Sequence, residues 1–142
     1  MKKLFLPFLF LLGVFALCTG CSSGVDRIGL QVHVIKLERK ADGSFLATLR
    51  FSNPNVGAIN VGKSTHQLSL NGKPAGVLEV TEPIGLPAQQ AVTTTVSFRP
   101  VGGSTGLAGE ISYQLVSSLT LRIYDNSIEH FKSSSAGTVT VL

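Results

Sequence analysis

The chain has 142 residues with twelve basic and eight acidic side chains, which gives a formal net charge of +4. Lys2 and Lys3 precede every acidic residue, so without these two the net charge is only +2. The remaining Lys and Arg residues are scattered and form no cluster with interleaved aromatic residues, so we expect no nucleic-acid partner. About 120 residues after the N-terminal segment can bury the core of one domain and are too few for two.

The first twenty residues have the pattern of a secretory signal peptide. Lys2 and Lys3 are followed by an apolar run over residues 4–17 and then by small residues. A helix of that length would span roughly 21 Å, which is shorter than the ~30 Å hydrocarbon core of a bilayer. The pattern therefore predicts a cleaved signal peptide over residues 1–20, and a permanent transmembrane helix is the less favoured alternative.

The end of this segment resembles a bacterial lipobox, in which a small residue precedes a cysteine that receives a lipid. Thr19, Gly20 and Cys21 fit that pattern, while Cys18 stands where an aliphatic residue is usual. The resemblance implies cleavage before Cys21 and a lipid on its sulfur. The alternative is that Cys18 and Cys21 pair as a disulfide or are ordinary leader residues.

Residues 21–27 are predicted to be the lipidated cysteine and a short tether, so the domain over residues 28–142 is expected close to a membrane. Ser22 follows Cys21 directly, which is unlike the Asp that retains lipoproteins in the inner membrane of enteric-type bacteria. The resemblance thus implies the periplasmic face of a bacterial outer membrane. In a Gram-positive cell, the same signal would imply the outer face of the plasma membrane.

The first patterned segment of the domain predicts a β-hairpin. Leu30, Val32 and Val34 alternate with polar residues, and the alternation slips at Ile35, which predicts a bulge. An Asp-Gly turn within residues 41–44 leads into a return strand. The inward residues of that strand are predicted to be Phe45, Ala47, Leu49 and Phe51.

A second hairpin and a further strand follow. Residues 66–70 alternate, Asn71-Gly72 predicts a turn, and residues 77–80 continue as a strand. Residues 82–90 contain two prolines and a glycine and predict a connecting loop. Residues 92–98 alternate again and predict a strand.

The C-terminal third begins with residues 101–110, which are rich in glycine and show no hydrophobic periodicity. This stretch predicts a loop, with one short helix near 103–110 as an alternative. Strands are then predicted at residues 111–115, 118–124 and 137–142. About seven to eight short strands joined by tight turns predict an all-β fold, an antiparallel β-sandwich.

Residues 57–64, GAINVGKS, match the nucleotide-binding P-loop pattern. A P-loop needs a helix after it, with Lys63 and Ser64 serving phosphate and magnesium. The following residues, THQLSLNG, alternate like a strand and end in a turn. We therefore expect no nucleotide binding, and Lys63 and Ser64 are predicted to face solvent where the next strand begins.

Residues 102–106, GGSTG, match the nucleophile-elbow pattern of hydrolases, and Asp125 and His130 follow Ser104 in the usual order of a triad. An elbow needs a strand, a sharp turn and a helix within a parallel sheet. The hairpins of this chain predict antiparallel strands instead. A flexible loop is the favoured interpretation, and we do not expect an enzyme.

The three histidines, His33, His66 and His130, are far apart, and none has a Cys, His or carboxylate at ligand spacing. His33 and His66 are assigned to the polar phase of their strands. We expect surface histidines, with no metal site and no cofactor. The carboxylates are scattered as well, so they indicate no acid–base pair.

Asn53-Pro54-Asn55 interrupts the second predicted strand. Pro54 has no N–H for a ladder hydrogen bond, and it favours an extended conformation at Asn53. The side-chain amides of Asn53 and Asn55 can bond neighbouring backbone groups in place of the lost ladder bonds. The pattern predicts a strand that stops pairing, kinks and then resumes.

The run FSNPNVGAINVGKSTHQLSLNGKPAG, followed by IGLPAQQAVTTTVSF, resembles the group 2 late embryogenesis abundant (LEA type 2) proteins, whose shared unit is the water stress and hypersensitive response (WHy) domain. The resemblance covers residues 28–142, and Val56 and Gly57 depart from it, since bulky apolar residues are usual there. The matching positions are Asn53, Pro54, Asn55, Leu68, Leu70, Asn71, Gly72, Leu86 and Pro87.

The resemblance implies a sandwich of immunoglobulin-like or fibronectin type III-like form, no catalytic residues, and a role in tolerance of desiccation or related stress. We therefore expect a non-enzymatic, lipid-anchored stress-protection protein that shields envelope proteins or membrane during water loss. The alternative is an adaptor or accessory subunit of an envelope assembly. Such a subunit would bind its partner through an exposed edge strand or through the loop at residues 100–110.

Overall fold

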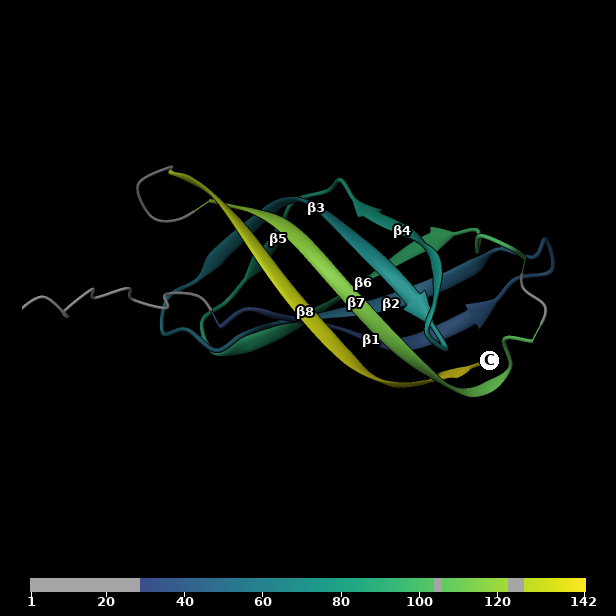
Figure 1. Cartoon of the computed structure of the whole chain (residues 1–142). Helices are drawn as coiled ribbons and strands as arrows, with labels where there is room; N and C mark the ends of the chain where they lie inside the picture. Colours follow the sequence, from purple (N-terminus) through teal and green to yellow (C-terminus); the bar gives the residue numbers. More distant parts are fainter. Residues whose placement is uncertain (1–28, 104–105, 123–126) are drawn as a thin grey trace, which may run out of the picture.

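The computed structural model describes residues 29–103, 106–122 and 127–142. Over these ranges the chain forms eight β-strands and no helix, so the all-β prediction is confirmed and the described part of 103–110 is not helical (Figure 1). The strands are β1 (Gln31–Arg39), β2 (Phe45–Asn53), β3 (Ile59–Leu70), β4 (Lys73–Val80), β5 (Ile84–Leu86), β6 (Gln90–Phe98), β7 (Gly109–Arg122) and β8 (Ile128–Val141).

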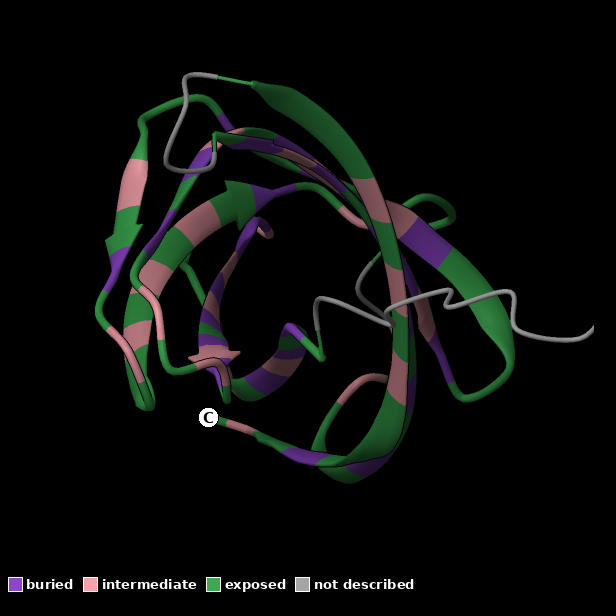
Figure 2. Cartoon of the chain, turned by 90° about the vertical axis from the view of Figure 1, so that its left-hand side faces the viewer, coloured by how far each residue is buried: buried purple, intermediate pink, exposed green. Residues whose placement is uncertain are grey.

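All eight strands belong to one curled sheet. Seven follow the order β4-β3-β7-β8-β1-β2-β6, and β5 pairs with β3. The pairings are antiparallel except that of β1 with β8, which is parallel and places Leu37 opposite Val141. Figure 2 shows the sheet rolled around its interior like a partly closed barrel. A sandwich of immunoglobulin or fibronectin type is not confirmed, because the parallel seam joins what would be two separate sheets.

β1 and β2 form the expected hairpin. Their register slips between Val34 and Lys36, which confirms the predicted bulge. The unbroken alternation of β2 turns every second side chain into the interior of the roll, where it is removed from water. Four of these side chains are fully buried: Phe45, Ala47, Leu49 and Phe51.

β3 pairs with three other strands, β4, β5 and β7. Its register with β7 slips between Val61 and Ser64, so a bulge changes which side chains face the core. At its start, Ile59 stands opposite Leu86 of β5. The sequence predicts a loop over residues 82–90 in the place of β5, because three residues are too few to show an alternation.

β7 and β8 are each 14 residues long and pair along their whole length. The sequence predicted two strands in the place of β7 and only the last part of β8, at residues 137–142. Both differences have the same cause. Serines occupy inward positions, Ser117 in β7 and Ser133 and Ser135 in β8, and they hide the apolar alternation that marks a strand.

The molecule has two distinct ends. At one end, which we call the entry end, Gly29 lies against Pro54, and a Cβ on Gly29 would sit 3.3 Å from the Pro54 ring. β1, β3 and β8 begin at this end, on the left in Figure 1. The far end holds the β1–β2 turn and the C-terminus. There the Val101 N–H donates a 2.8 Å hydrogen bond to the Ala75 carbonyl, which draws the β6 side of the roll toward the edge strand β4.

Candidate functional site

The P-loop pattern lies largely within a strand. Residues 59–64 belong to β3, and β3 continues to Leu70 as a strand rather than a helix. Its backbone amides therefore serve the sheet and do not converge on a phosphate. Lys63 is exposed, as predicted. Ser64 is only 1% exposed, so the prediction that it faces solvent is wrong, and the bulge between Val61 and Ser64 explains why it points inward.

Behind this stretch, three polar side chains form a buried cluster between β3 and β7. His66 Nε2 lies 3.0 Å from Ser64 Oγ, and His66 Nδ1 lies 2.8 Å from Ser117 Oγ. The Phe51 ring meets the imidazole edge-on, with ring centroids 5.6 Å apart. His66 is fully buried, and this burial lowers its pKa to about 4, because removal from water disfavours the charged ring. The imidazole is therefore neutral at pH 7.

The prediction of a surface position for His66 is wrong. His66 stands two residues before Leu68 and four before Leu70, so all three share one face of β3. That spacing was the signal that could have placed His66 in the core. Because Ser64 and Ser117 are buried with it, neither hydroxyl is open to a substrate. The cluster is a polar link between two strands.

Asn53 ends β2 and is 2% exposed. Its Nδ2 group lies within hydrogen-bonding distance of three carbonyl oxygens, those of Gly57 at 2.9 Å, Leu86 at 3.2 Å and Pro87 at 3.1 Å. The two N–H bonds of the amide are thus shared among three acceptors. One buried side chain ties the end of β2 to the segment before β3 and to the end of β5.

Asn55 completes this joint. Its backbone N–H and its Nδ2 donate to Asn53 Oδ1 at 3.0 and 2.9 Å, and its carbonyl accepts a 3.0 Å bond from the Gln89 N–H. Pro54, which is exposed, lies beside Gly29. The structure therefore brings five of the motif residues together at the entry end: Asn53, Pro54, Asn55, Leu86 and Pro87.

Asn71 and Gly72 lie apart from this joint, in the β3–β4 turn at the far end. Their φ angles of 49° and 74° are those of a type I′ hairpin turn. The Asn71 N–H donates to the Ser112 carbonyl at 2.9 Å, and the Ser112 N–H donates to Asn71 Oδ1 at 3.2 Å. These bonds pin the turn to β7.

The other two histidines are separate from His66. His33 is half-buried, with Nδ1 3.2 Å from Tyr113 Oη and Nε2 3.4 Å from Gln31 Oε1. His130 is exposed on β8. Among the residues that the structure describes, no group of three or more His, Cys, Asp or Glu side chains could hold a metal ion.

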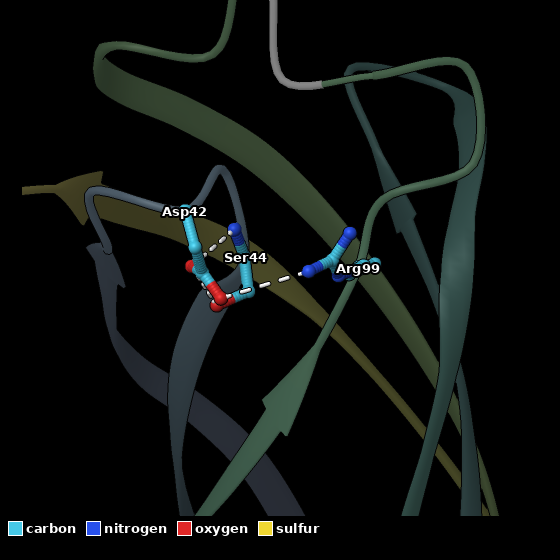
Figure 3. Close-up of polar contacts among 3 residues, drawn as sticks. All are labelled: Asp42, Ser44 and Arg99. Atoms are coloured by element: carbon cyan, nitrogen blue, oxygen red, sulfur yellow. Dashed lines mark hydrogen bonds and ion pairs between the residues drawn. The ribbon is translucent and has the colours of Figure 1, made fainter.

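The β1–β2 turn carries a small polar cluster at the far end (Figure 3). Asp42 Oδ1 accepts bonds from the Ser44 N–H at 3.0 Å and from Ser44 Oγ at 2.6 Å, and Asp42 Oδ2 lies 3.7 Å from an Arg99 nitrogen. The two bonds from Ser44 lower the pKa of Asp42. Asp42 and Arg99 are both exposed, so the cluster stabilises a turn, as Asp commonly does, and encloses no site.

A cavity of about 490 Å³ opens at the far end, between Asn71 of the β3–β4 turn and residues 100–103 and 106–107. Leu70, Ala75 and Leu107 give it an apolar lining, and exposed Lys73 adds a charge. Part of the loop that the sequence nominates for partner binding forms one wall.

Some features singled out in the sequence lie outside the described residues: the leader and tether over residues 1–27, with Cys21, and also Ser104 and Asp125. Within the three described ranges, no helix has the length and apolar character needed to cross a bilayer.

The sequence matches no protein-family model and no curated protein. The structure is similar to the solution structure of AT1g01470 from Arabidopsis thaliana, with a TM-score of 0.58 and 18% identity over 80% of this chain and 83% of that chain. It is also similar to an Arabidopsis protein described as "a putative late embryogenesis abundant (LEA) protein", At2g46140.1, with a TM-score of 0.53 and 16% identity over 91% of this chain and 78% of that chain. At these identities the likeness is one of fold, and the chain has a fold of the LEA type.

Proposed function

We propose that the protein is a non-enzymatic, membrane-anchored member of the LEA type 2 or WHy family that protects envelope proteins or membrane during water loss. The observation that carries the proposal is the fold it shares with a protein described as LEA. The joint built around Asn53 supports it, because four of the residues that resemble the family motif, Asn53, Asn55, Leu86 and Pro87, are joined there by hydrogen bonds. In this proposal the curled sheet is this chain's form of the family's immunoglobulin-like or fibronectin-like sandwich.

The outer face of the sheet supports a protective role. Hydroxyl and amide side chains dominate the exposed positions of three strands, and charges are few. Such groups hydrogen-bond to water and keep a hydrated layer between neighbouring molecules as bulk water is withdrawn. The exposed residues concerned are Thr93, Thr95 and Ser97 in β6, Ser112, Gln114 and Ser118 in β7, and Ser134, Thr138 and Thr140 in β8.

The anchor is proposed to be a lipid on Cys21, which would hold the domain on the periplasmic face of the outer membrane, or on the outer face of the plasma membrane in a Gram-positive cell. Residues 21–28 would separate the lipid from Gly29. At full extension eight residues span about 26 Å. The entry end would therefore face the bilayer, and the far end would face client proteins.

Protection is tested by drying a desiccation-sensitive enzyme together with the purified protein. We expect less aggregation, measured by light scattering after rehydration, than with an equal mass of an unrelated β-sandwich protein. Equal aggregation in the two samples would remove the protective role.

Anchoring is tested by mass spectrometry of the mature N-terminus. The wild-type chain should begin at Cys21 and carry the mass of a lipid, and Cys21→Ala should lose that mass. An unmodified Cys21 in the wild type would refute the anchor and leave the protective role to stand on the drying assay.

The adaptor function remains the second candidate, and the far-end cavity favours it. A hollow of about 490 Å³ with an apolar lining and an exposed Val101 beside it could receive a side chain of a partner protein. Crosslinking in whole cells separates the two functions. A single stoichiometric partner supports the adaptor, whereas a diffuse set of partners supports protection.

A further inference from the structure

A shallow pocket of about 300 Å³ lies where β3, β7 and β8 run side by side. Strand register brings its polar side chains together, because Ser118 stands opposite both Thr65 and Lys132. One step along the sheet, Thr120 stands opposite His130. All the polar side chains that matter here are exposed or half-buried: Lys63, Thr65, Ser118, Thr120, His130 and Lys132.

The bulge in β3 is what adds Lys63 to this group. It leaves two residues, Gly62 and Lys63, between inward-facing Val61 and Ser64, so the lysine remains exposed beside the pocket while the serine is buried. A regular strand would place only one residue between two inward-facing positions. The irregularity that removes the P-loop interpretation therefore also supplies the pocket with a second lysine.

Among the described residues that line the pocket, none is acidic. Glu79 stands opposite Thr65 on β4, the strand that pairs with β3 beside Lys63, but it does not line the pocket. Glu129 stands opposite Leu121, which is buried, so it belongs to the other face of β8. Ammonium groups beside hydroxyl donors, in a lining that itself carries no carboxylate, provide the chemistry that binds phosphate.

The pocket lies in the half of the sheet nearest the entry end. Arg122 and Ile128 stand opposite each other at the adjoining ends of β7 and β8, and both line a neighbouring hollow of about 250 Å³. Ile128 is 59% exposed, and Val56, next to the Asn53 joint, is 88% exposed. Cations and exposed apolar side chains together are typical of a surface that meets phospholipid headgroups.

We propose that the pocket formed by Lys63, His130 and Lys132 binds the phosphate groups of anionic phospholipids, and that this contact holds the entry end against the membrane. The inference rests on the proposed anchoring, because a tether of eight residues before Gly29 keeps this end near the bilayer. The lipid would attach the domain to the membrane, and the pocket would fix the orientation of the domain on the membrane surface.

The proposal is tested with the purified full chain reconstituted in vesicles of phosphatidylcholine alone or with roughly one third phosphatidylglycerol. The rate of lysine acetylation is followed residue by residue by mass spectrometry. A lysine at an anionic surface contributes a factor of about five to binding, so we expect acetylation of Lys63 and Lys132 to slow about fivefold in the anionic vesicles. Lys40 and Lys73, exposed at the far end, should react equally in both. Half-molar salt should abolish the difference.

Single-lysine variants sharpen this test. Lys63→Gln should remove most of the slowing of Lys132 acetylation in anionic vesicles, because both side chains contact the same headgroups. Lys73→Gln changes the net charge equally at the far end and should leave that slowing intact. The proposal is overturned if Lys63 and Lys132 react at the same rate in both kinds of vesicle, or if the two variants behave alike.

Two further outcomes separate this proposal from its rivals. Equal protection by soluble glycerol 3-phosphate without vesicles would show a solute site and would overturn the assignment to membrane headgroups. The mass of the N-terminal peptide from the same digests reports the anchor independently. Slower acetylation of Lys63 and Lys132 on a chain with an unmodified Cys21 would support the pocket and refute the anchor. A lipidated Cys21 without slower acetylation of these lysines would support the anchor and refute the pocket.

Discussion

His66 couples the stability of the fold to pH. Its pKa is about 4 in the folded protein and near 6.5 when the ring is free in water, so the unfolded chain takes up the proton first as pH falls. Stability is therefore fully present above pH 6.5 and declines between pH 6.5 and 4. We expect a loss of roughly 3 kcal/mol over that window, measured as the free energy of unfolding in urea at each pH.

The matched control is His66→Gln, which removes the titrating ring and keeps hydrogen-bonding groups near Ser64 and Ser117. Other groups titrate in both proteins, so the difference between the two pH profiles isolates His66. The variant should be less stable at pH 7 and should show a much flatter slope between pH 6.5 and 4. Parallel profiles would mean that the imidazole is not held neutral by burial.

Asn53 acts on the scale of elements, because its side chain joins β2, β5 and the start of β3. Asn53→Ala leaves the Gly57, Leu86 and Pro87 carbonyls without this donor, where the bond to Leu86 is buried and the other two are part-buried. Each buried polar group that loses its partner costs about 1–3 kcal/mol. We expect the free energy of unfolding to fall by about 3 kcal/mol in urea denaturation.

Asn60→Ala is the control for this prediction. Asn60 is exposed on neighbouring β3, and the same substitution there should change stability by no more than about 0.5 kcal/mol. Hydrogen exchange gives a second reading, since Asn53→Ala should speed exchange of the Asn55 and Gln89 amides. If the two alanine variants are equally stable, the joint does not hold these strands.

The elements that could be predicted are those whose signal is local. β2 alternates without interruption, the slip at Ile35 marks the bulge in β1, and Asn71-Gly72 has the residues that a type I′ turn requires. Where the signal depends on a distant strand, prediction fails. The alternation of β7 places Ser117 on the inward face with Leu115 and Leu119, but nothing near Ser117 in the sequence shows that His66 of β3 supplies its hydrogen-bond partner.

The candidate sites, too, could be predicted only where their signal is local in the sequence. The prediction that Asn53 would bond backbone groups after β2 follows from its neighbour Pro54, whereas two of its partners, Leu86 and Pro87, lie more than thirty residues away. The basic pocket could not be predicted, because a bulge in β3 and the register of β7 with β8 bring Lys63 and Lys132 together. Only their positive charge is visible in the sequence.

For the molecule as a whole, the distinguishing feature is the parallel seam between β1 and β8. The Leu142 N–H donates to the Leu37 carbonyl at 2.9 Å, and the Arg39 N–H donates to the Leu142 carbonyl at 2.8 Å. Further along, Ser135 Oγ donates to the Val32 carbonyl. The seam joins β4-β3-β7-β8 to β1-β2-β6 in one sheet, and it lies between residues about a hundred positions apart, which is why the sequence predicted a sandwich instead.

Leu142→Pro tests how much this seam contributes. Proline has no N–H, so the bond to the Leu37 carbonyl is lost, while Leu142 is already 65% exposed and buries little. We expect the free energy of unfolding to fall by about 1 kcal/mol and the Arg39 amide to exchange faster. Leu142→Ala keeps the N–H and should stay within about 0.5 kcal/mol of the wild type.

The comparison of these two variants decides between two descriptions of the molecule. If proline destabilises and alanine does not, hydrogen bonds across the seam help to hold the roll closed, and the fold is one continuous sheet in energy as well as in geometry. If both variants match the wild type, the two halves are held by the packing of their buried faces alone. That is how a sandwich of separate sheets is held, and the sandwich predicted from the sequence would then describe the energetics better than the strand order does.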